Sequence, residues 1–170
     1  MHIDYLCDHP HLIEELAELN FKEWGEFRPG DTLAARTERM RAACGKGAIP
    51  SVVVAIEDGR LLGGALLIDS DMKIRPQLTP WLAGVYVKSE ERGRGIASQL
   101  VNRIVNEAAA LGVTELYLYT DAAQSLYARL GWEVVEDLVY EELPVTVMKF
   151  NIAPTGNRGV STGLDQNASL

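Results

Sequence analysis

The clearest periodic pattern in the chain lies between Gly95 and Leu111, where apolar residues recur at intervals of three and four. Polar side chains occupy the positions between them, as on the exposed face of an amphipathic helix. Gly112 is placed to end this helix, because glycine accepts the left-handed backbone found after a helix C-terminus. The predicted apolar face consists of Ile96, Ala97, Leu100, Val101, Ile104, Val105, Ala108 and Leu111.

The rest of the pattern predicts strands and three further helices. Asp58-Gly59 separates two runs rich in β-formers and is typical of a tight hairpin turn. A second hairpin is expected around Leu143-Pro144. The predicted strands cover 3–7, the two arms of 51–69, 81–87, 113–120, 132–140 and 145–150, and the predicted helices cover 10–24, 31 or 32 to about 43, and 122–131.

This order, β-α-α-β-β-β-α-β-α-β-β, places hairpins early and late and one strand–helix–strand crossover in the middle. It indicates a mixed α/β (α+β) sheet with helices on both faces. The 170 residues suggest one domain over 1–152. The tail 153–170 is rich in Gly, Ser, Thr and Asn, and we expect it to be disordered.

The composition indicates the class of protein and its location in the cell. With 47% hydrophobic and 24% charged residues, the chain is typical of a globular protein. No apolar run approaches the roughly 20 residues of a membrane span, and the first ten residues lack the pattern of a signal peptide. We therefore expect a cytoplasmic protein without a membrane partner.

Cysteine and histidine give no strong site. Cys7 and Cys44 form no CxxC pair and are expected to be free thiols. His9 and His11 could share a metal, but no further ligand stands at a usual spacing, so we expect surface histidines and no metal.

The charge is unevenly distributed. The net charge of −8 argues against nucleic acid as a partner. Residues 1–30 carry seven acids and two bases, and residues 133–150 carry five acids and one base. Residues 88–103 instead carry four bases (Lys88, Arg92, Arg94, Arg103) and two acids, a small basic island that suits a local anion.

The basic island contains Arg92-Gly93-Arg94-Gly95 directly before the strongest helix. The first N–H groups of a helix lack intrahelical partners, and the helix dipole is positive at that end. Gly93 and Gly95 let an anion approach the backbone closely, and the two arginines add charge. The alternative is a solvated basic turn.

Three phosphate-binding patterns could apply to this stretch. The chain has no GxxxxGK[ST] loop, and Ser98 stands where the dinucleotide fingerprint needs Gly or Ala. The pattern Arg-x-x-Gly-x-Gly/Ala is met by Arg92, Gly95 and Ala97. With this pattern, and with Tyr127-Ala128-Arg129-Leu130-Gly131-Trp132 in the form [FY]xxxG[FWY] about 30 residues later, the chain resembles the GCN5-related N-acetyltransferase (GNAT) family.

The resemblance implies a mostly antiparallel sheet of six to seven strands, in which strands 81–87 and 114–119 splay apart into a V. Acetyl-coenzyme A (acetyl-CoA) would enter this gap as co-substrate, with its pantetheine paired to the backbone around Val85 and Val87. Many members have Asn where this chain has Thr120, so that contact is in question. The residues that the resemblance implies for the pyrophosphate are Arg92, Gly93, Arg94, Gly95, Ile96 and Ala97.

The resemblance also implies the chemistry. A primary amine would attack the thioester directly, and the Tyr127 phenol would assist the departing sulfur. The strand 81–87 has no acid that could act as base. Other candidates at the cleft mouth are Glu23, Glu26, Asp69 and Asp71, but a plain surface acid is the favoured interpretation of each, and a water chain could serve instead.

The family resemblance and the distribution of charge also suggest residues for the acceptor pocket and the charge of the acceptor. Trp24 and Trp81 are candidates for the acceptor pocket, together with Glu26 and Asp69, although core packing explains the tryptophans nearly as well. Trp132 is expected in the core. Because the acidic ends of the chain would border the acceptor side, we expect a small-molecule or peptide amine with positive charge.

Two other functions remain open from the sequence. The protein could bind acyl-CoA as a sensor or regulatory subunit without catalysis, although Tyr127 argues against this. A nicotinamide-dependent dehydrogenase is a more distant alternative. The last strand, at a sheet edge, could also support a homodimer.

Overall fold

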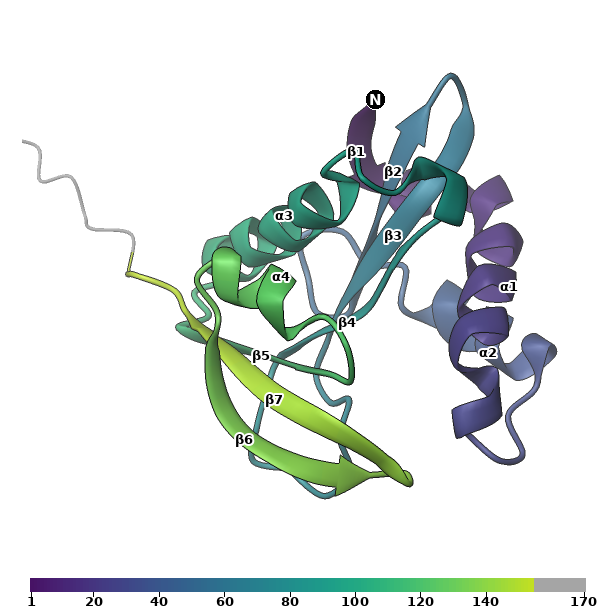
Figure 1. Cartoon of the computed structure of the whole chain (residues 1–170). Coiled ribbons are helices and arrows are strands. Elements are labelled where there is room, and N and C mark those ends of the chain that lie inside the picture. Colours follow the sequence, from purple (N-terminus) through teal and green to yellow (C-terminus); the bar gives the residue numbers. More distant parts are fainter. Residues whose placement is uncertain (155–170) are drawn as a thin grey trace, which may run out of the picture.

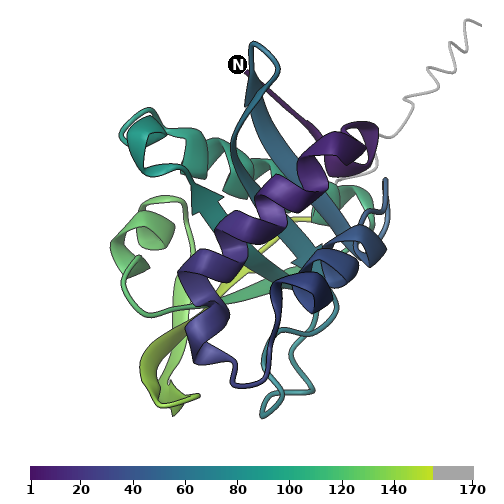
Figure 2. The ribbon, with the colours of Figure 1, turned by 90° about the vertical axis from the view of Figure 1, so that its right-hand side faces the viewer.

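The computed structural model describes residues 1–154 and contains one seven-stranded sheet with helices on both faces (Figures 1 and 2). The tail that was expected to be disordered lies almost entirely outside the described residues. The strands are β1 (His2–Tyr5), β2 (Ser51–Glu57), β3 (Arg60–Ile68), β4 (Trp81–Val87), β5 (Glu115–Thr120), β6 (Glu133–Tyr140) and β7 (Leu143–Asn151). The helices are α1 (Ile13–Trp24), α2 (Leu33–Ala42), α3 (Ile96–Ala110) and α4 (Gln124–Arg129), with short 3-10 turns at Leu6–Asp8, Pro10–Leu12, Gly25–Phe27 and Ser89–Glu91.

The predicted order of elements is confirmed. The Thr32 hydroxyl accepts a hydrogen bond from the Ala35 N–H at 3.1 Å and caps α2. Asp58 and Gly59 have φ of 51° and 75°, as the predicted tight turn between β2 and β3 requires. Cys7 and Cys44 are free thiols.

The predicted position of the last turn is wrong. Glu141 and Glu142 form it, with φ of 49° and 67°, and Pro144 lies inside β7 opposite Val139. Proline fits there because β7 pairs with β5 only from Thr146 onward, so the missing N–H leaves no ladder bond unmade on that side.

The sheet opens between its two middle strands. Its order is β1-β2-β3-β4-β5-β7-β6, and every neighbouring pair is antiparallel except β4 and β5. These two strands run parallel and pair only at Trp81 and Tyr117. The predicted V-shaped splay is therefore confirmed, and the edge of β4 beyond Trp81 has no strand partner on that side.

A bulge in β4 accompanies the opening. Gly64 pairs with Tyr86 and Leu66 with Ala83, so that two residues of β4 stand opposite one residue of β3. One of the two, Gly84, has φ of 56°, and a Cβ there would lie 2.7 Å from Leu66 Cδ1. Glycine is thus required both by the backbone conformation and by the close packing.

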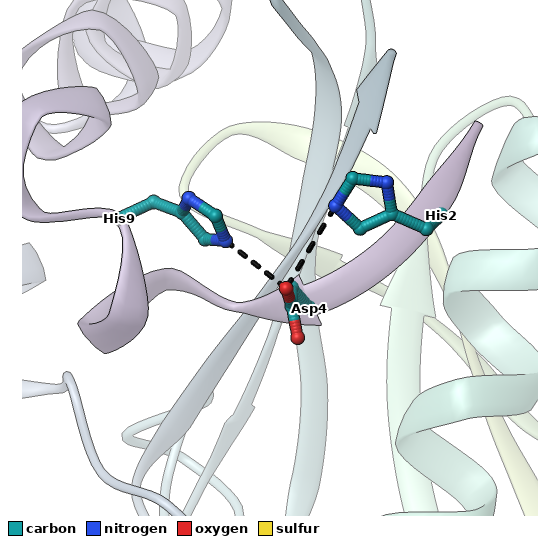
Figure 3. A group of neighbouring side chains, drawn as sticks. All are labelled: His2, Asp4 and His9. Atoms are coloured by element: carbon teal, nitrogen blue, oxygen red, sulfur yellow. Dashed lines mark hydrogen bonds and ion pairs between the residues drawn. The ribbon is translucent and has the colours of Figure 1, made fainter. Parts of the chain in front are cut away.

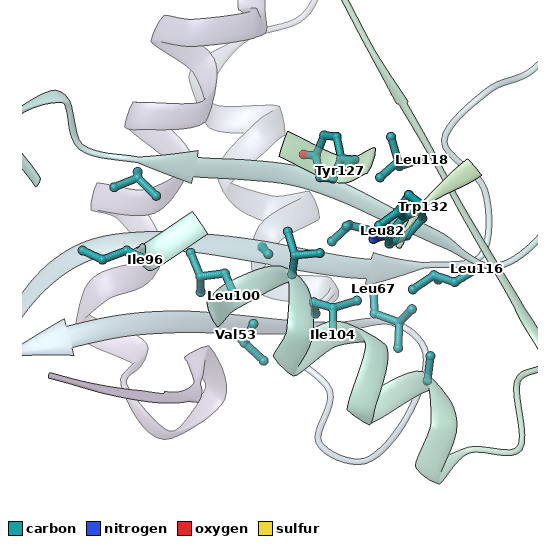
Figure 4. Packing of buried hydrophobic residues seen from close by; sticks show 14 of the residues in the cluster. Val53, Leu67, Leu82, Ile96, Leu100, Ile104, Leu116, Leu118, Tyr127 and Trp132 are labelled. Atoms are coloured by element: carbon teal, nitrogen blue, oxygen red, sulfur yellow. The ribbon is translucent and has the colours of Figure 1, made fainter. Parts of the chain in front are cut away.

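The two faces of the sheet have separate cores. The cluster under α3 and α4 includes Leu100, Ile104, Leu118 and Trp132, and Figure 4 shows Tyr127 at its edge. The expected core position of Trp132 is confirmed, since it is 3% exposed. On the opposite face, one cluster lies under α1 and α2. A second lies beside it and consists of Met72, Trp81, Tyr117, Tyr140, Val145 and Val147.

Among residues 1–154, none of the helices combines the length and apolar character that crossing a membrane requires.

Candidate functional site

A large cleft occupies the opening between β4 and β5. Its volume is about 1400 Å³, which exceeds the 300–1,000 Å³ of a usual small-molecule site and leaves room for two ligands. Its walls come from β4, the segment after β5, α4, α1 and the loop that follows β3. Because the opening passes between two strands, the cleft reaches both faces of the sheet.

The N-terminus of α3 presents free backbone donors at one end of the cleft. Gly93 and Gly95 have φ of 77° and 75°, a conformation that favours glycine, and a Cβ at either position would meet no atom within 4 Å. Among residues 1–154, no group accepts a hydrogen bond from the N–H groups of 93–98. Six successive donors at a positive helix end form an anion-binding cradle.

The two arginines of this loop differ. Arg94 donates to Glu57 at 2.9 Å and to Glu91, so its charge is already balanced. Arg92 lines the cleft, and its Nε donates to the Val87 carbonyl at 3.1 Å. Its guanidinium also lies 5.9 Å from the centre of the Tyr86 ring.

The basic island is therefore mostly neutralised. Lys88 pairs with Glu15 at 2.6 Å, and Arg103 pairs with Glu107 at 2.6 Å. Within the described part of the chain, Arg92 is the one base of the island without a carboxylate partner. It is the arginine that the cleft can offer to an anion.

The other residues predicted for this end occupy different depths. Val85, Val87 and Ala97 line the cleft, whereas the Ile96 side chain is buried in the core and leaves only its N–H at the cradle. The Thr120 hydroxyl accepts a hydrogen bond from the Ala123 N–H at 3.0 Å. Its own O–H stays available as a donor toward the cleft.

Tyr127 lines the cleft from α4. The residue is 7% exposed, and its hydroxyl makes no hydrogen bond to any residue between 1 and 154. Burial raises the pKa of Tyr127 to about 12. The phenol is therefore protonated at neutral pH and can donate a hydrogen bond into the cleft.

The opposite face carries the predicted tryptophans at different places. Trp24 lines the cleft and stands edge-on to Tyr86, with 6.2 Å between ring centroids. Trp81 is completely buried, is not among the residues that line the cleft, and donates its indole N–H to the Leu78 carbonyl at 2.7 Å. The Trp81 ring packs against Tyr119, with 6.2 Å between the ring centroids. Its position therefore fits core packing and does not fit the expected pocket wall.

Acidic side chains line the cleft on this face, but they are not mainly those that the charge count singled out. Of the acids in 1–30 and 133–150, most lie elsewhere, many of them in ion pairs such as Asp8 with Lys46 or Glu136 with Arg75. The loop after β3 adds two acids that the count did not include. The acids that line this part of the cleft are Glu23, Glu26, Asp69, Asp71 and Glu141.

Asp71 differs from the other acids. Its side chain is 15% exposed, whereas Glu23, Glu26 and Asp69 are exposed. Burial is the largest influence and raises the pKa of Asp71 to about 6, although the Arg28 guanidinium, with Nη2 3.6 Å from Oδ1, lowers it.

Sequence reasoning missed three neighbours of this carboxyl, namely Arg28, Tyr119 and Glu141. They come from three separate segments, and no local motif marks them. Tyr119 is buried enough that the pKa of its phenol is raised, with the Asp71 charge as a further cause.

A separate group of possible metal ligands lies away from the cleft, with His2 and Asp4 on β1 and His9 after the 3-10 turn that follows it. The ligand atoms of His2, Asp4 and His9 lie within 4.8 Å of one another, and Figure 3 shows both rings directed at the carboxylate. His9 Nε2 is 3.1 Å from Asp4 Oδ2, and this hydrogen bond is the largest cause of the lowered pKa of Asp4. The hydrogen bond accounts for the grouping, and none of the three lines the cleft. The absence of a metal stays a prediction.

Comparisons with known proteins place the chain among acetyltransferases. The sequence profile of the acetyltransferase (GNAT) family matches residues 13–132. A search of curated protein sequences finds no match.

Solved structures match nearly the whole chain. An aminoglycoside 6'-N-acetyltransferase complexed with coenzyme A is 20% identical, with a TM-score of 0.71, over 92% of this chain and 100% of that one. The aminoglycoside 6'-N-acetyltransferase from Enterococcus faecium is 20% identical, with a TM-score of 0.69, over 92% of this chain and 100% of that one. The yncA protein from Salmonella typhimurium, solved with its cofactor acetyl-CoA, is 20% identical, with a TM-score of 0.67, over 100% of this chain and 97% of that one. At this identity, the likeness shows the fold.

The position of Asp71 predicts a cost in stability. Asp71→Asn is expected to raise the free energy of unfolding at pH 8 by up to about 3 kcal/mol, since each pKa unit corresponds to about 1.4 kcal/mol. A folded pKa of about 6 above the ordinary 3.8 means that the cost is absent below about pH 4 and grows up to about pH 6. Urea unfolding of both proteins at pH 4 and at pH 8 measures this difference in the free energy of unfolding.

The matched control for this measurement is Asp69→Asn, an exposed acid of the same loop, which should change stability by less than about 0.5 kcal/mol. An equal gain at both pH values for Asp71→Asn would show that burial of the charge is not the cause.

Proposed function

Since the chain belongs to the acetyltransferase (GNAT) family, it is an N-acetyltransferase, and we propose that it moves the acetyl group of acetyl-CoA to a primary amine of a small, positively charged acceptor. The observation that carries this proposal is the cleft between β4 and β5, which holds a backbone anion cradle and a free tyrosine hydroxyl. One ligand would enter from the face of α3 and α4, and the other from the face of α1.

The residues at the α3 end fit coenzyme A. Its pyrophosphate would accept hydrogen bonds from the N–H groups of 93–98 and pair with Arg92, while Arg94 stays with its carboxylates. The unpaired edge of β4 at Val85 and Val87 would pair with the pantetheine amides as an added strand does. The Val87 carbonyl already accepts from Arg92, which leaves its N–H for this role.

When bound, acetyl-CoA supplies an acyl group already activated as a thioester. Tyr127 then stabilises the negative charge that develops on sulfur by donating its hydroxyl hydrogen bond. Because the pKa of Tyr127 is about 12 and that of a free thiol is about 8.5, complete proton transfer to sulfur is uphill. Thr120 can donate a further hydrogen bond to the cofactor arm.

The acids of the opposite face support a cationic acceptor. Of the other bases that line the cleft on this side, Arg36 and Arg39 both donate to Asp31 at 2.7 Å and Arg28 pairs with Asp71. The exposed Lys22 has no carboxylate partner within residues 1–154, so five acids stand against one base that is not paired. The remaining carboxylates would raise the local concentration of a cation. Two structural relatives are named for aminoglycosides, which carry several amines, but their low identity leaves the acceptor to be found by experiment.

The alternative is a protein that binds acyl-CoA without catalysis, which the anion cradle would also permit and against which the Tyr127 hydroxyl in the cleft argues. Thiol release on adding an amine distinguishes the two. The expectation that the last strand lies at the sheet edge is wrong, because β7 lies between β5 and β6. We also propose a cytoplasmic location and a homodimer through the edge strand β6, whose Val134 and Val139 are 60% and 68% exposed.

Gly95→Val is expected to lower the affinity for coenzyme A by tenfold or more, which is about 1.4 kcal/mol, because the side chain would fill the cradle. Calorimetry measures the affinity. The matched control is Gly112→Val at the other end of α3, where φ is 79° and the space is equally open. Equal affinity of both variants would place the pyrophosphate elsewhere.

Tyr127→Phe removes only the hydroxyl and preserves the packing of the ring. We expect kcat to fall by about 10²–10⁴ or somewhat less, with the affinity for coenzyme A nearly unchanged. A thiol-release assay at saturating substrates measures kcat. A change within twofold, while the chemical step limits the rate, would remove Tyr127 from the reaction.

A cationic acceptor predicts a dependence on salt. Raising the ionic strength from about 0.01 M to 0.15 M shortens the screening length from about 30 Å to 8 Å, so kcat/KM should fall clearly while kcat changes little. An acetylation screen across amine classes identifies the substrate for this test. A best acceptor that is neutral or acidic, or that is indifferent to salt, would contradict the proposed charge.

A further inference from the structure

The cleft contains one carboxyl that is withdrawn from solvent and has no hydrogen-bond partner within residues 1–154. This is Asp71, whose side chain is 15% exposed and contacts Arg28 only as an ion pair at 3.6 Å. The other acids considered as a base, Glu23, Glu26 and Asp69, are exposed at the rim. Burial therefore separates Asp71 from acids that only contribute to the surface charge.

The loop that carries Asp71 is fixed on both sides of the sheet opening. The next residue, Met72, is completely buried against Trp81 and Tyr117. The Lys73 N–H donates to the Tyr140 hydroxyl at 3.3 Å. Further along, Arg75 donates two hydrogen bonds to Glu136, at 2.5 and 3.0 Å. A carboxyl on such an anchored backbone keeps a defined position in the cleft.

Three groups from other elements influence this carboxyl. Arg28, which follows Gly25–Phe27, lowers its pKa, and Glu141 of the β6–β7 turn raises it, while burial has the largest effect. Tyr119 of β5 faces the same space as a neutral phenol, since its pKa is raised. The result is a carboxyl that is ionised at neutral pH yet far more basic than an exposed one, the condition under which a general base works best.

We propose that Asp71 binds the ammonium group of the acceptor and removes one of its protons, acting as the general base of the transfer. This inference rests on the proposed function and deepens it. The amine nitrogen then forms its bond to the acetyl carbon, and the carbon–sulfur bond breaks with its electron pair remaining on sulfur. The second proton leaves the nitrogen for the thiolate, and Asp71 returns its proton to water.

Arg28 has a distinct part in this arrangement. Its side chain is 43% exposed, and Asp71 is its one carboxylate partner in the described part of the chain. The guanidinium therefore occupies the position for which an acceptor cation would compete. Without it, Asp71 should bind a cation more readily and titrate at higher pH, because an attractive positive charge has been removed.

The test is the pH profile of kcat/KM for the full chain with acetyl-CoA and the most active amine among spermidine, tobramycin and a lysine-rich peptide. The wild-type profile should fall below about pH 6. Asp71→Asn should lower kcat/KM by about 10²–10⁴ and remove this acidic limb. Arg28→Gln should lower KM for the amine and move the limb to higher pH, because Asp71 then lacks its attractive positive charge.

The matched control is Glu142→Gln, which removes one exposed carboxylate beside the cleft without lining it. It should stay within twofold of wild type and keep the limb. An acidic limb that persists in Asp71→Asn, or a loss smaller than threefold, would overturn the proposal. A merely structural role is separated by the unfolding measurement, since Asp71→Asn is expected to be more stable than wild type at neutral pH.

A second measurement does not depend on catalysis. A ¹³C NMR titration of the Asp71 carboxyl in the full chain should give a midpoint near pH 6. A midpoint at the ordinary value near 4 would also overturn the assignment. If no amine of the panel releases thiol from any variant, the proposed function fails instead, and the titration still decides on Asp71.

Discussion

The single contact between β4 and β5 is the constraint on which the rest of the molecule depends. Two parallel strands that pair only at Trp81 and Tyr117 cannot close the sheet beyond that point. The bulge at Gly84 bends β4 where its pairing partner on the other side changes register. Within residues 1–154, the edge of β4 beyond Trp81 has no strand partner on the β5 side, and the N–H groups at the start of α3 have no acceptor. Such unpaired groups are costly in a folded protein unless a ligand or water satisfies them.

The opening also separates two kinds of chemistry onto opposite faces. On the face of α3 and α4, the cleft offers neutral backbone donors, the Tyr127 hydroxyl and Arg92, which has no carboxylate partner among the described residues. On the other face it offers carboxylates and aromatic rings. A ligand rich in phosphate and a cationic acceptor would therefore be attracted to different ends of one cavity, and their reacting groups would meet at the splay.

The proposed role of Asp71 has a cost in stability. Its ionised carboxyl is 15% exposed and has no hydrogen-bond partner within residues 1–154, which disfavours the folded state at neutral pH, as its raised pKa indicates. Around it the fold is firmly built, because Met72 and Trp81 are completely buried and Tyr140 anchors the loop backbone. Perturbed pKa values of this kind are typical of sites whose groups take part in a reaction.

The sequence by itself determined the elements and the cofactor end of the site. Helical and strand periods, the Asp58-Gly59 turn and the spacing from Arg92 to Ala97 are local properties of the chain, so they predicted the order of elements along the chain and a candidate anion site before α3. The sequence misplaced the last turn, because Pro144 seemed to mark it and the left-handed Glu141 and Glu142 carry no such signal. Only the tertiary structure decided which arginine is already paired. Arg92 and Arg94 are equivalent in the sequence pattern, but the fold places Glu57 beside Arg94. It also decided that Trp81 is core and that Asp71 is the withdrawn acid, because burial and the approach of Arg28 depend on segments far apart in the chain.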